Sequence, residues 1–193
     1  MIVITNPIPI ANEINTIHSL FESGLELLHV RKPDYSDEEM IAFLSKIELK
    51  HCSKLVLHHH HDLAEEFGIN RIHFTETKRF QLRITADQFI ESTSTHSITD
   101  FNSLHTRFDY AFLSPIYPSI SKPNYVSRMN LLETTKQRTN FKTKLVALGG
   151  VSSENITETY KFGFDSVALL GTIWNSKNPI ENFKLCQQFA HSF

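Results

Sequence analysis

Two hydroxyl groups and a cation follow one apolar run of the chain. Residues 110–113 form a run of strand length, and the prolines that come next prevent a helix directly after it. The segment then supplies Ser119, Ser121 and Lys122, and hydroxyl and ammonium groups are donors that bind phosphate oxygens. Serine and lysine are also ordinary residues of exposed loops. The stretch alone therefore allows both a phosphate-binding loop and a solvated one.

Histidine is frequent, with 11 residues, four of them consecutive at positions 58–61. His29, His73 and His96 lie near other expected strand ends, so a metal site is one interpretation. No carboxylate or cysteine stands at a ligand-like spacing, which favours a solvated or hydrogen-bonded rim of histidines instead. Because histidine titrates near neutral pH, proton transfer by one of them is a third interpretation.

The spacing within the histidine run predicts which side chains share a face. In an extended segment His58 and His60 point one way, and His59 and His61 point the other.

Composition limits the class of protein. At 193 residues and a net charge of −2, we expect one domain over residues 1–193, with neither nucleic acid nor a membrane as a partner. Two scattered cysteines indicate a reduced, cytoplasmic setting. No apolar run approaches the ~20 residues needed to span a bilayer. The first five residues lack the basic region of a signal peptide and are typical of a strand.

Short apolar runs alternate with segments of helical period along the whole chain. The expected strands are 2–5, 25–30, 54–57, 71–74, 89–93, 110–113, 144–148 and 166–170. The expected helices are 10–22, 36–47, one from Asp62 to about residue 68, 99–108, 130–137, 152–162 and 179–191, with a short one between residues 77 and 88. Ser36 and Glu39 have the spacing of a capping box, and Ser152 or Ser153 is the expected cap of the helix that follows.

Eight strands alternating with helices predict parallel pairing through helical crossovers. A doubly wound sheet is the open alternative. The eightfold count, without a G-x-G-x-x-G motif after the first strand, favours a small closed (β/α)8 TIM barrel.

In such a barrel, chemistry is carried by the residues that directly follow the strands. Two of these turns contain glycine, Gly149-Gly150 and Gly171-Thr172, and let backbone N–H groups approach an anion. A tight turn alone would also favour glycine, but two such turns at neighbouring strand ends favour phosphate. The other residues expected at strand ends are Arg31, Lys32, the four histidines, Thr75, Glu76, Ser94, His96, Ser119, Ser121 and Lys122.

Seven groups of residues have an order and spacing that are specific when taken together. They are Arg31; Asp62-Leu63-Ala64; Gly68 with Ile72-His73; Ser94-Thr95-His96-Ser97; Ser114-Pro115-Ile116-Tyr117 with Ser119, Ser121 and Lys122; Leu148-Gly149-Gly150-Val151 with Asn155; and Gly163 with Val167-Ala168. In this order they resemble the thiamine phosphate synthase and thiazole tautomerase family over nearly the whole chain.

The resemblance implies an enzyme that joins a pyrimidine carrying diphosphate to a thiazole carrying phosphate and releases pyrophosphate. It implies that Arg31, Ser94 and Lys122 hold the diphosphate. The remaining ligand candidates are Lys32, His59, Ser119, Ser121, Gly149, Gly150, Gly171 and Thr172. Arg31, Lys122, His58 and His96 are the catalytic candidates.

Two departures from the family pattern leave the reaction open. The resemblance implies Mg²⁺, but the positions of its carboxylate ligands are occupied by His59 and Lys78, and carboxylate oxygens are what magnesium prefers. The tautomerase branch uses a histidine where this chain has Pro115. Synthase is the leading hypothesis, with a thiazole phosphate tautomerase using His58 or His96, or a non-catalytic thiamine phosphate binder, as alternatives. Pairing into a homodimer is compatible with this fold.

Overall fold

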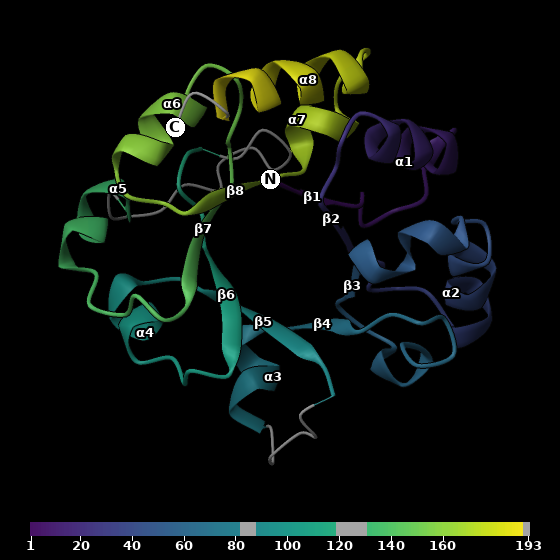
Figure 1. The fold of residues 1–193 in the computed structure, drawn as a ribbon, viewed down its shortest axis with the longest axis horizontal. Helices are drawn as coiled ribbons and strands as arrows, with labels where there is room; N and C mark the ends of the chain where they lie inside the picture. The colour runs from purple at the N-terminus through teal and green to yellow at the C-terminus, as the bar shows by residue number, and fades with distance from the viewer. Residues whose placement is uncertain (82–87, 119–130, 191–193) are drawn as a thin grey trace.

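Eight parallel strands close into a barrel in the computed structural model, which describes residues 1–81, 88–118 and 131–190 (Figure 1). The strands pair in chain order, and β1 closes the barrel on β8 through the register Ile2↔Ala168. They are β1 (Ile2–Ile4), β2 (Leu27–Val30), β3 (Leu55–Leu57), β4 (Arg71–Phe74), β5 (Ile90–Thr95), β6 (Phe108–Leu113), β7 (Lys144–Leu148) and β8 (Ser166–Leu169). The predicted (β/α)8 barrel is confirmed.

Helices surround the barrel and cover the outer faces of its strands (Figure 1). They are α1 (Glu13–Glu22), α2 (Asp37–Leu44), α3 (Glu76–Gln81), α4 (Ile98–Asn102), α5 (Leu131–Thr134), α6 (Ile156–Lys161), α7 (Gly171–Trp174) and α8 (Pro179–Ala190), with 3-10 turns η1 (Leu49–Lys54), η2 (His61–Leu63) and η3 (Thr135–Gln137). Ser36 and Glu39 form the predicted capping box at the start of α2. Within the described residues no helix is both long enough and apolar enough to cross a membrane.

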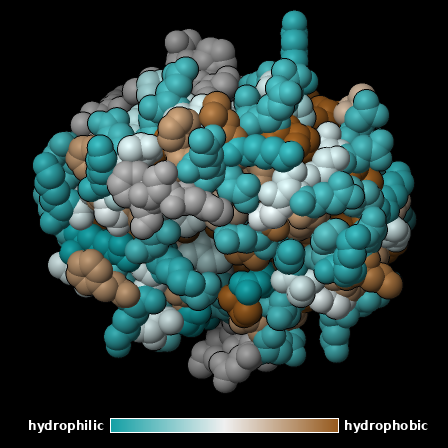
Figure 2. Space-filling model, turned by 45° about the horizontal axis from the view of Figure 1, so that its top comes forward, coloured by the Kyte–Doolittle hydropathy of each residue, from teal (hydrophilic) through white to brown (hydrophobic). Residues whose placement is uncertain are grey.

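Side chains alternate between two cores because successive strand residues point to opposite faces. The larger core lies between strands and helices. A smaller one fills part of the barrel interior with Ile2, Ile4, Tyr110, Phe112, Val146 and Ala168. On the face seen in Figure 2, hydrophobic residues are interspersed with hydrophilic ones.

Several predicted boundaries are wrong for local reasons. No α-helix follows Asp62; the segment forms only the 3-10 turn η2, whose N-cap His60 is left-handed with φ of 54°. The helix expected over residues 99–108 ends at Asn102, since Phe108 joins β6 and pairs with Glu91 of β5.

Further differences lie nearer the carboxyl ends of the strands. Strand β5 continues to Thr95, two residues beyond its expected end. Helix α6 begins at Ile156 and not at the expected caps, because Ser152 and Asn155 form a separate turn in which the Ser152 N–H donates to Asn155 Oδ1 (2.9 Å). Helix α7 was not predicted, and its four residues are too few to show a helical period.

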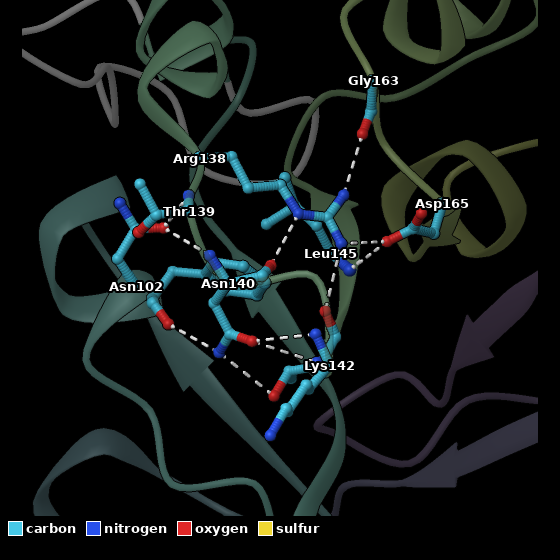
Figure 3. A network of polar contacts seen from close by, with 10 residues as sticks. Asn102, Arg138, Thr139, Asn140, Lys142, Leu145, Gly163 and Asp165 are labelled. Carbon is cyan, nitrogen blue, oxygen red and sulfur yellow. Dashed lines mark hydrogen bonds and ion pairs between the residues drawn. The ribbon is translucent and has the colours of Figure 1, made fainter.

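The amino-terminal end of β7 and β8 is tied together by a polar network (Figure 3). Arg138 donates to Asp165 Oδ2 (2.7 Å) and to the carbonyls of Asn140, Thr143 and Gly163. The same Asp165 oxygen accepts from the Leu145 N–H (2.6 Å). A cation at this end of the barrel therefore fixes loop geometry.

Candidate active site

Arg31 directly follows β2 at the carboxyl end of the barrel. Its backbone exchanges two hydrogen bonds with the Thr5 hydroxyl, which accepts from the Arg31 N–H (2.9 Å) and donates to the Arg31 carbonyl (3.2 Å). The residue after β1 and the residue after β2 are thus held together, which places Arg31 at the predicted strand end.

Lys32 is buried and paired with a carboxylate. Its side chain is fully buried, and its ammonium group lies 2.6 and 2.8 Å from the two carboxylate oxygens of Glu13 in α1. It also lies over the rings of Tyr35 and Phe43. Burial lowers the pKa of Lys32 and raises that of Glu13, and their mutual attraction opposes both shifts. These contacts fix α1 and α2 to the barrel, and phosphate binding by Lys32 stays a prediction.

The four consecutive histidines occupy different environments, and the predicted alternation is wrong. Strand β3 ends at Leu57, and the left-handed turn at His60 redirects the chain. His58 enters the barrel interior with 5% of its surface exposed, so it is not on a solvated rim. His60 Nδ1 lies 2.5 Å from Asp37 of α2, and His61 packs edge-on against Phe74.

His59 marks a cluster of positive charge beside the strand ends. Its pKa is lowered to about 4, first by burial and then by the charges of Lys78 and Arg31. Arg31 also contributes to the lowered pKa of His58, after burial and two neighbouring histidines. The charges of Arg31, which follows β2, and of Lys78 in α3 therefore both act on His59, which suits an anionic ligand.

Three histidines from neighbouring strands meet inside the barrel: His29 of β2, His58 after β3 and His73 of β4. His29 Nδ1 lies 2.8 Å from His58 Nε2, and the His29 Nε2 lies 2.5 Å from the Tyr110 hydroxyl. His73 stacks on His58 with ring centroids 4.2 Å apart. Burial lowers the pKa of each, to about 3 for His73, so all three imidazoles are neutral at pH 7.

One interpretation of the sequence grouped His29 and His73 with the histidine run at a metal site, but it did not predict that His58 joins them inside the barrel. His29 and His73 lie inside expected strands, and the barrel register sets which faces of these strands point inward.

Ser94 and His96 come from β5 and the loop behind it. Ser94 lies within the strand and not after it, and its hydroxyl is 2.9 Å from His73 Nε2. Its carbonyl accepts from Arg79 (3.0 Å), and the other terminal nitrogen of that guanidinium donates to both carboxylate oxygens of Asp100. His96 is half exposed; its Nδ1 donates to the Ser114 carbonyl (2.7 Å), and its Nε2 lies 3.8 Å from Glu76. In the described part of the chain no hydrogen bond joins His96 to His58, and catalysis by either stays a prediction.

The glycine pair after β7 packs against the loop after β6. Gly149 and Gly150 have φ of 100° and 66°, and a Cβ on Gly150 would lie 2.4 Å from the Pro118 carbonyl oxygen. The Ile116 and Tyr117 N–H groups donate to the carbonyls of Leu148 and Gly149, both at 3.0 Å. The pair therefore fixes the start of the loop that carries the predicted phosphate ligands. Ser119, Ser121 and Lys122 themselves lie outside the described residues.

Gly171 and Thr172 form the start of α7. The Thr172 hydroxyl donates to the Val151 carbonyl, and the Thr172 carbonyl accepts from Asn182 (3.1 Å). This ties the loop after β8 to the loop after β7. Phosphate binding by Gly149, Gly150, Gly171 and Thr172 stays a prediction.

Comparison with known proteins assigns the chain to a family. A sequence model described as thiamine monophosphate synthase matches residues 1–173. The chain belongs to the thiamine monophosphate synthase family. The thiamine-phosphate synthase of Dictyoglomus thermophilum is 23% identical over 181 residues, which cover 89% of this chain and 80% of that protein.

Solved structures agree with this membership. Thiamine phosphate pyrophosphorylase from Bacteroides thetaiotaomicron is 31% identical with a TM-score of 0.81, covering 99% of this chain and 97% of that one. The Pyrococcus furiosus protein of the same name shares the fold with a TM-score of 0.79 at 16% identity, covering 99% and 95%. The predicted family, a family of transferases of thiamine biosynthesis, is confirmed.

Proposed function

We propose that the chain joins hydroxymethylpyrimidine diphosphate to thiazole phosphate and releases pyrophosphate. The bond between the pyrimidine methylene carbon and the diphosphate oxygen breaks, and the same carbon forms a bond to the thiazole nitrogen. The electron pair of the broken bond leaves with pyrophosphate. Besides family membership, the electrostatic effect of both Lys78 and Arg31 on His59 supports this proposal, since fixed cations stabilise the charge that grows on a leaving diphosphate.

Magnesium does not fit the residues that occupy its family positions. Mg²⁺ takes oxygen ligands in near-octahedral geometry, whereas His59 offers an imidazole and Lys78 an ammonium. The cations that lower the pKa of His59 would also repel a metal dication there. We infer that Lys78 and Arg31 neutralise the diphosphate directly, and that Lys122, Ser119 and Ser121 bind the phosphate groups.

A pair of variants tests this assignment. Thiamine phosphate formation from the two phosphorylated precursors is measured with Mg²⁺ and with EDTA, in the unmodified chain and in the double variant His59→Asp/Lys78→Asp. We expect turnover by the unmodified chain to persist in EDTA and turnover by the double variant to require Mg²⁺. Loss of turnover in EDTA by the unmodified chain would contradict the direct role of Lys78.

Proton transfer is the second candidate function, and the geometry of His96 favours it. The Ser114 carbonyl fixes His96 Nδ1 as a donor, so Nε2 carries the lone pair at the half-exposed edge of the ring, near Glu76. Incubation with the thiazole phosphate alone, following its tautomers, distinguishes an isomerase from a synthase. If calorimetry shows tight binding of thiamine phosphate and neither synthase nor isomerase turnover is detected, the chain is a binding protein.

A further inference from the structure

The three interior histidines have the composition and spacing of a metal site. His29, His58 and His73 each present one ring nitrogen such that the three nitrogens lie within 4.8 Å of one another. All three side chains are buried, with at most 5% of their surface exposed. Within the described residues, this group contains neither a carboxylate nor a thiolate. Imidazole-only sites suit late first-row transition ions such as Zn²⁺, and not Mg²⁺ or Ca²⁺.

The distances between the ring nitrogens fit an ion of this size after small movements of the side chains. Zn–N bonds of about 2.0–2.1 Å in a tetrahedron place ligand nitrogens roughly 3.3 Å apart. The separation between His29 Nδ1 and His58 Nε2 is 2.8 Å, and the other separations stay within 4.8 Å. The two nearest nitrogens share a single hydrogen bond, so a bridging proton occupies the place that a metal ion would take.

Outer hydrogen-bond partners are already in place for two of the rings. The Tyr110 hydroxyl contacts the second nitrogen of His29, and Ser92 and Ser94 contact the two nitrogens of His73, each at 2.9 Å. If one ring nitrogen of His73 binds the metal ion, the other keeps its hydrogen bond to a serine hydroxyl. Such partners fix the tautomer and orientation of metal-bound histidines.

We propose that His29, His58 and His73 bind one divalent transition-metal ion, with Zn²⁺ as the expected class, inside the barrel. Three protein ligands leave the fourth tetrahedral position for water or an anion. The charge of Arg31 also acts on His58 and His73, and an anion in the fourth position would offset it. The proposal does not depend on the proposed transferase reaction.

Cobalt(II) titration of the protein, purified without a polyhistidine tag, tests the proposal. We expect one equivalent of Co²⁺ to give the intense visible absorption of tetrahedral coordination, and Zn²⁺ to displace it. His58→Gln and His73→Gln should each lower the affinity by at least about 100-fold, since loss of an outer partner alone costs about 10–100-fold. Tyr110→Phe should lower it by about 10-fold.

The matched control is His60→Gln/His96→Gln, which removes histidines outside the barrel interior and should leave Co²⁺ affinity unchanged. The Co²⁺ titration of the unmodified chain tests the proposal even where an interior variant fails to fold. Three results would overturn the proposal. They are a spectrum that shows only the weak absorption of octahedral Co²⁺, a failure to bind one equivalent, and a loss of binding in the control variant.

Discussion

Arg138 and Arg31 lie at opposite ends of the same barrel and are used differently. The Arg138 guanidinium is shared among three backbone carbonyls and the carboxylate of Asp165 (Figure 3). Lys32 is likewise paired, with Glu13. Over residues 1–81, 88–118 and 131–190, neither Arg31 nor Lys78 forms an ion pair. Paired cations hold the fold together, whereas the unpaired ones are available to a ligand.

Breaking the most deeply buried pair should give the largest effect. Glu13→Ala leaves the Lys32 ammonium buried without a partner, which we expect to lower the free energy of unfolding by about 3–5 kcal/mol. Urea denaturation measures it. The double variant Glu13→Leu/Lys32→Met removes both charges and should recover most of the stability. A normal unfolding midpoint in Glu13→Ala with reduced substrate affinity would instead return Lys32 to the substrate site.

Removing an unpaired cation should affect turnover and leave stability intact. We expect Arg31→Ala or Lys78→Ala to lower kcat/KM by about 100-fold, or about 2.7 kcal/mol, because charge on the leaving group loses a fixed donor. The free energy of unfolding should change by no more than about 0.5 kcal/mol. Lys142→Ala, an exposed cation at the other end of the barrel, is the control and should leave both quantities unchanged. A loss of unfolding free energy in Arg31→Ala as large as that in Arg138→Ala would contradict the distinction between cations that stabilise the fold and cations that bind a ligand.

Breaking the network around Arg138 should lower stability and leave turnover intact. Arg138→Ala deletes four hydrogen bonds, one of them to a carboxylate, and we expect a loss of about 2 kcal/mol of unfolding free energy. The turnover of the remaining folded protein should equal that of the unmodified chain. Thermal denaturation together with an assay below the transition separates the two quantities.

The last effect expected is at the glycine turn. Gly150→Ala places a Cβ against backbone at a positive φ, which should cost more than about 1 kcal/mol of stability. Because the displaced atoms belong to the loop after β6, we expect KM to rise more than kcat falls. Gly68→Ala is the matched control, since Gly68 also has a positive φ but no atom within 4 Å of a Cβ. The same change in KM for both variants would show that packing against Pro118 is irrelevant.

Local patterns predicted the fold well, and contacts between distant segments decided what the sequence missed. Apolar runs and the Ser36–Glu39 capping box are readable from neighbouring residues, and the structure has both. The Lys32–Glu13 pair joins residues 19 positions apart, and nothing near Lys32 distinguishes it from a ligand-binding cation. The end of β5 was missed because its last residues are polar and alternate between the interior and the helices.

The histidine cluster shows the same limit at the site. His29 and His73 are ordinary strand residues by position and His58 directly follows a strand, and only the register of β2, β3 and β4 places the three rings together. Conversely, the strand-end positions of Arg31 and His96 needed only the order of elements, and these were predicted correctly.

The hydrogen bonds from Ile116 and Tyr117 to the turn after β7 extend the pairing of β6 and β7 beyond the ends of the strands. Residues 115–118 therefore lose their conformational entropy when the protein folds and not when a ligand arrives. A ligand at this end of the barrel meets a surface that is partly preorganised, and more of its contact energy is retained as affinity.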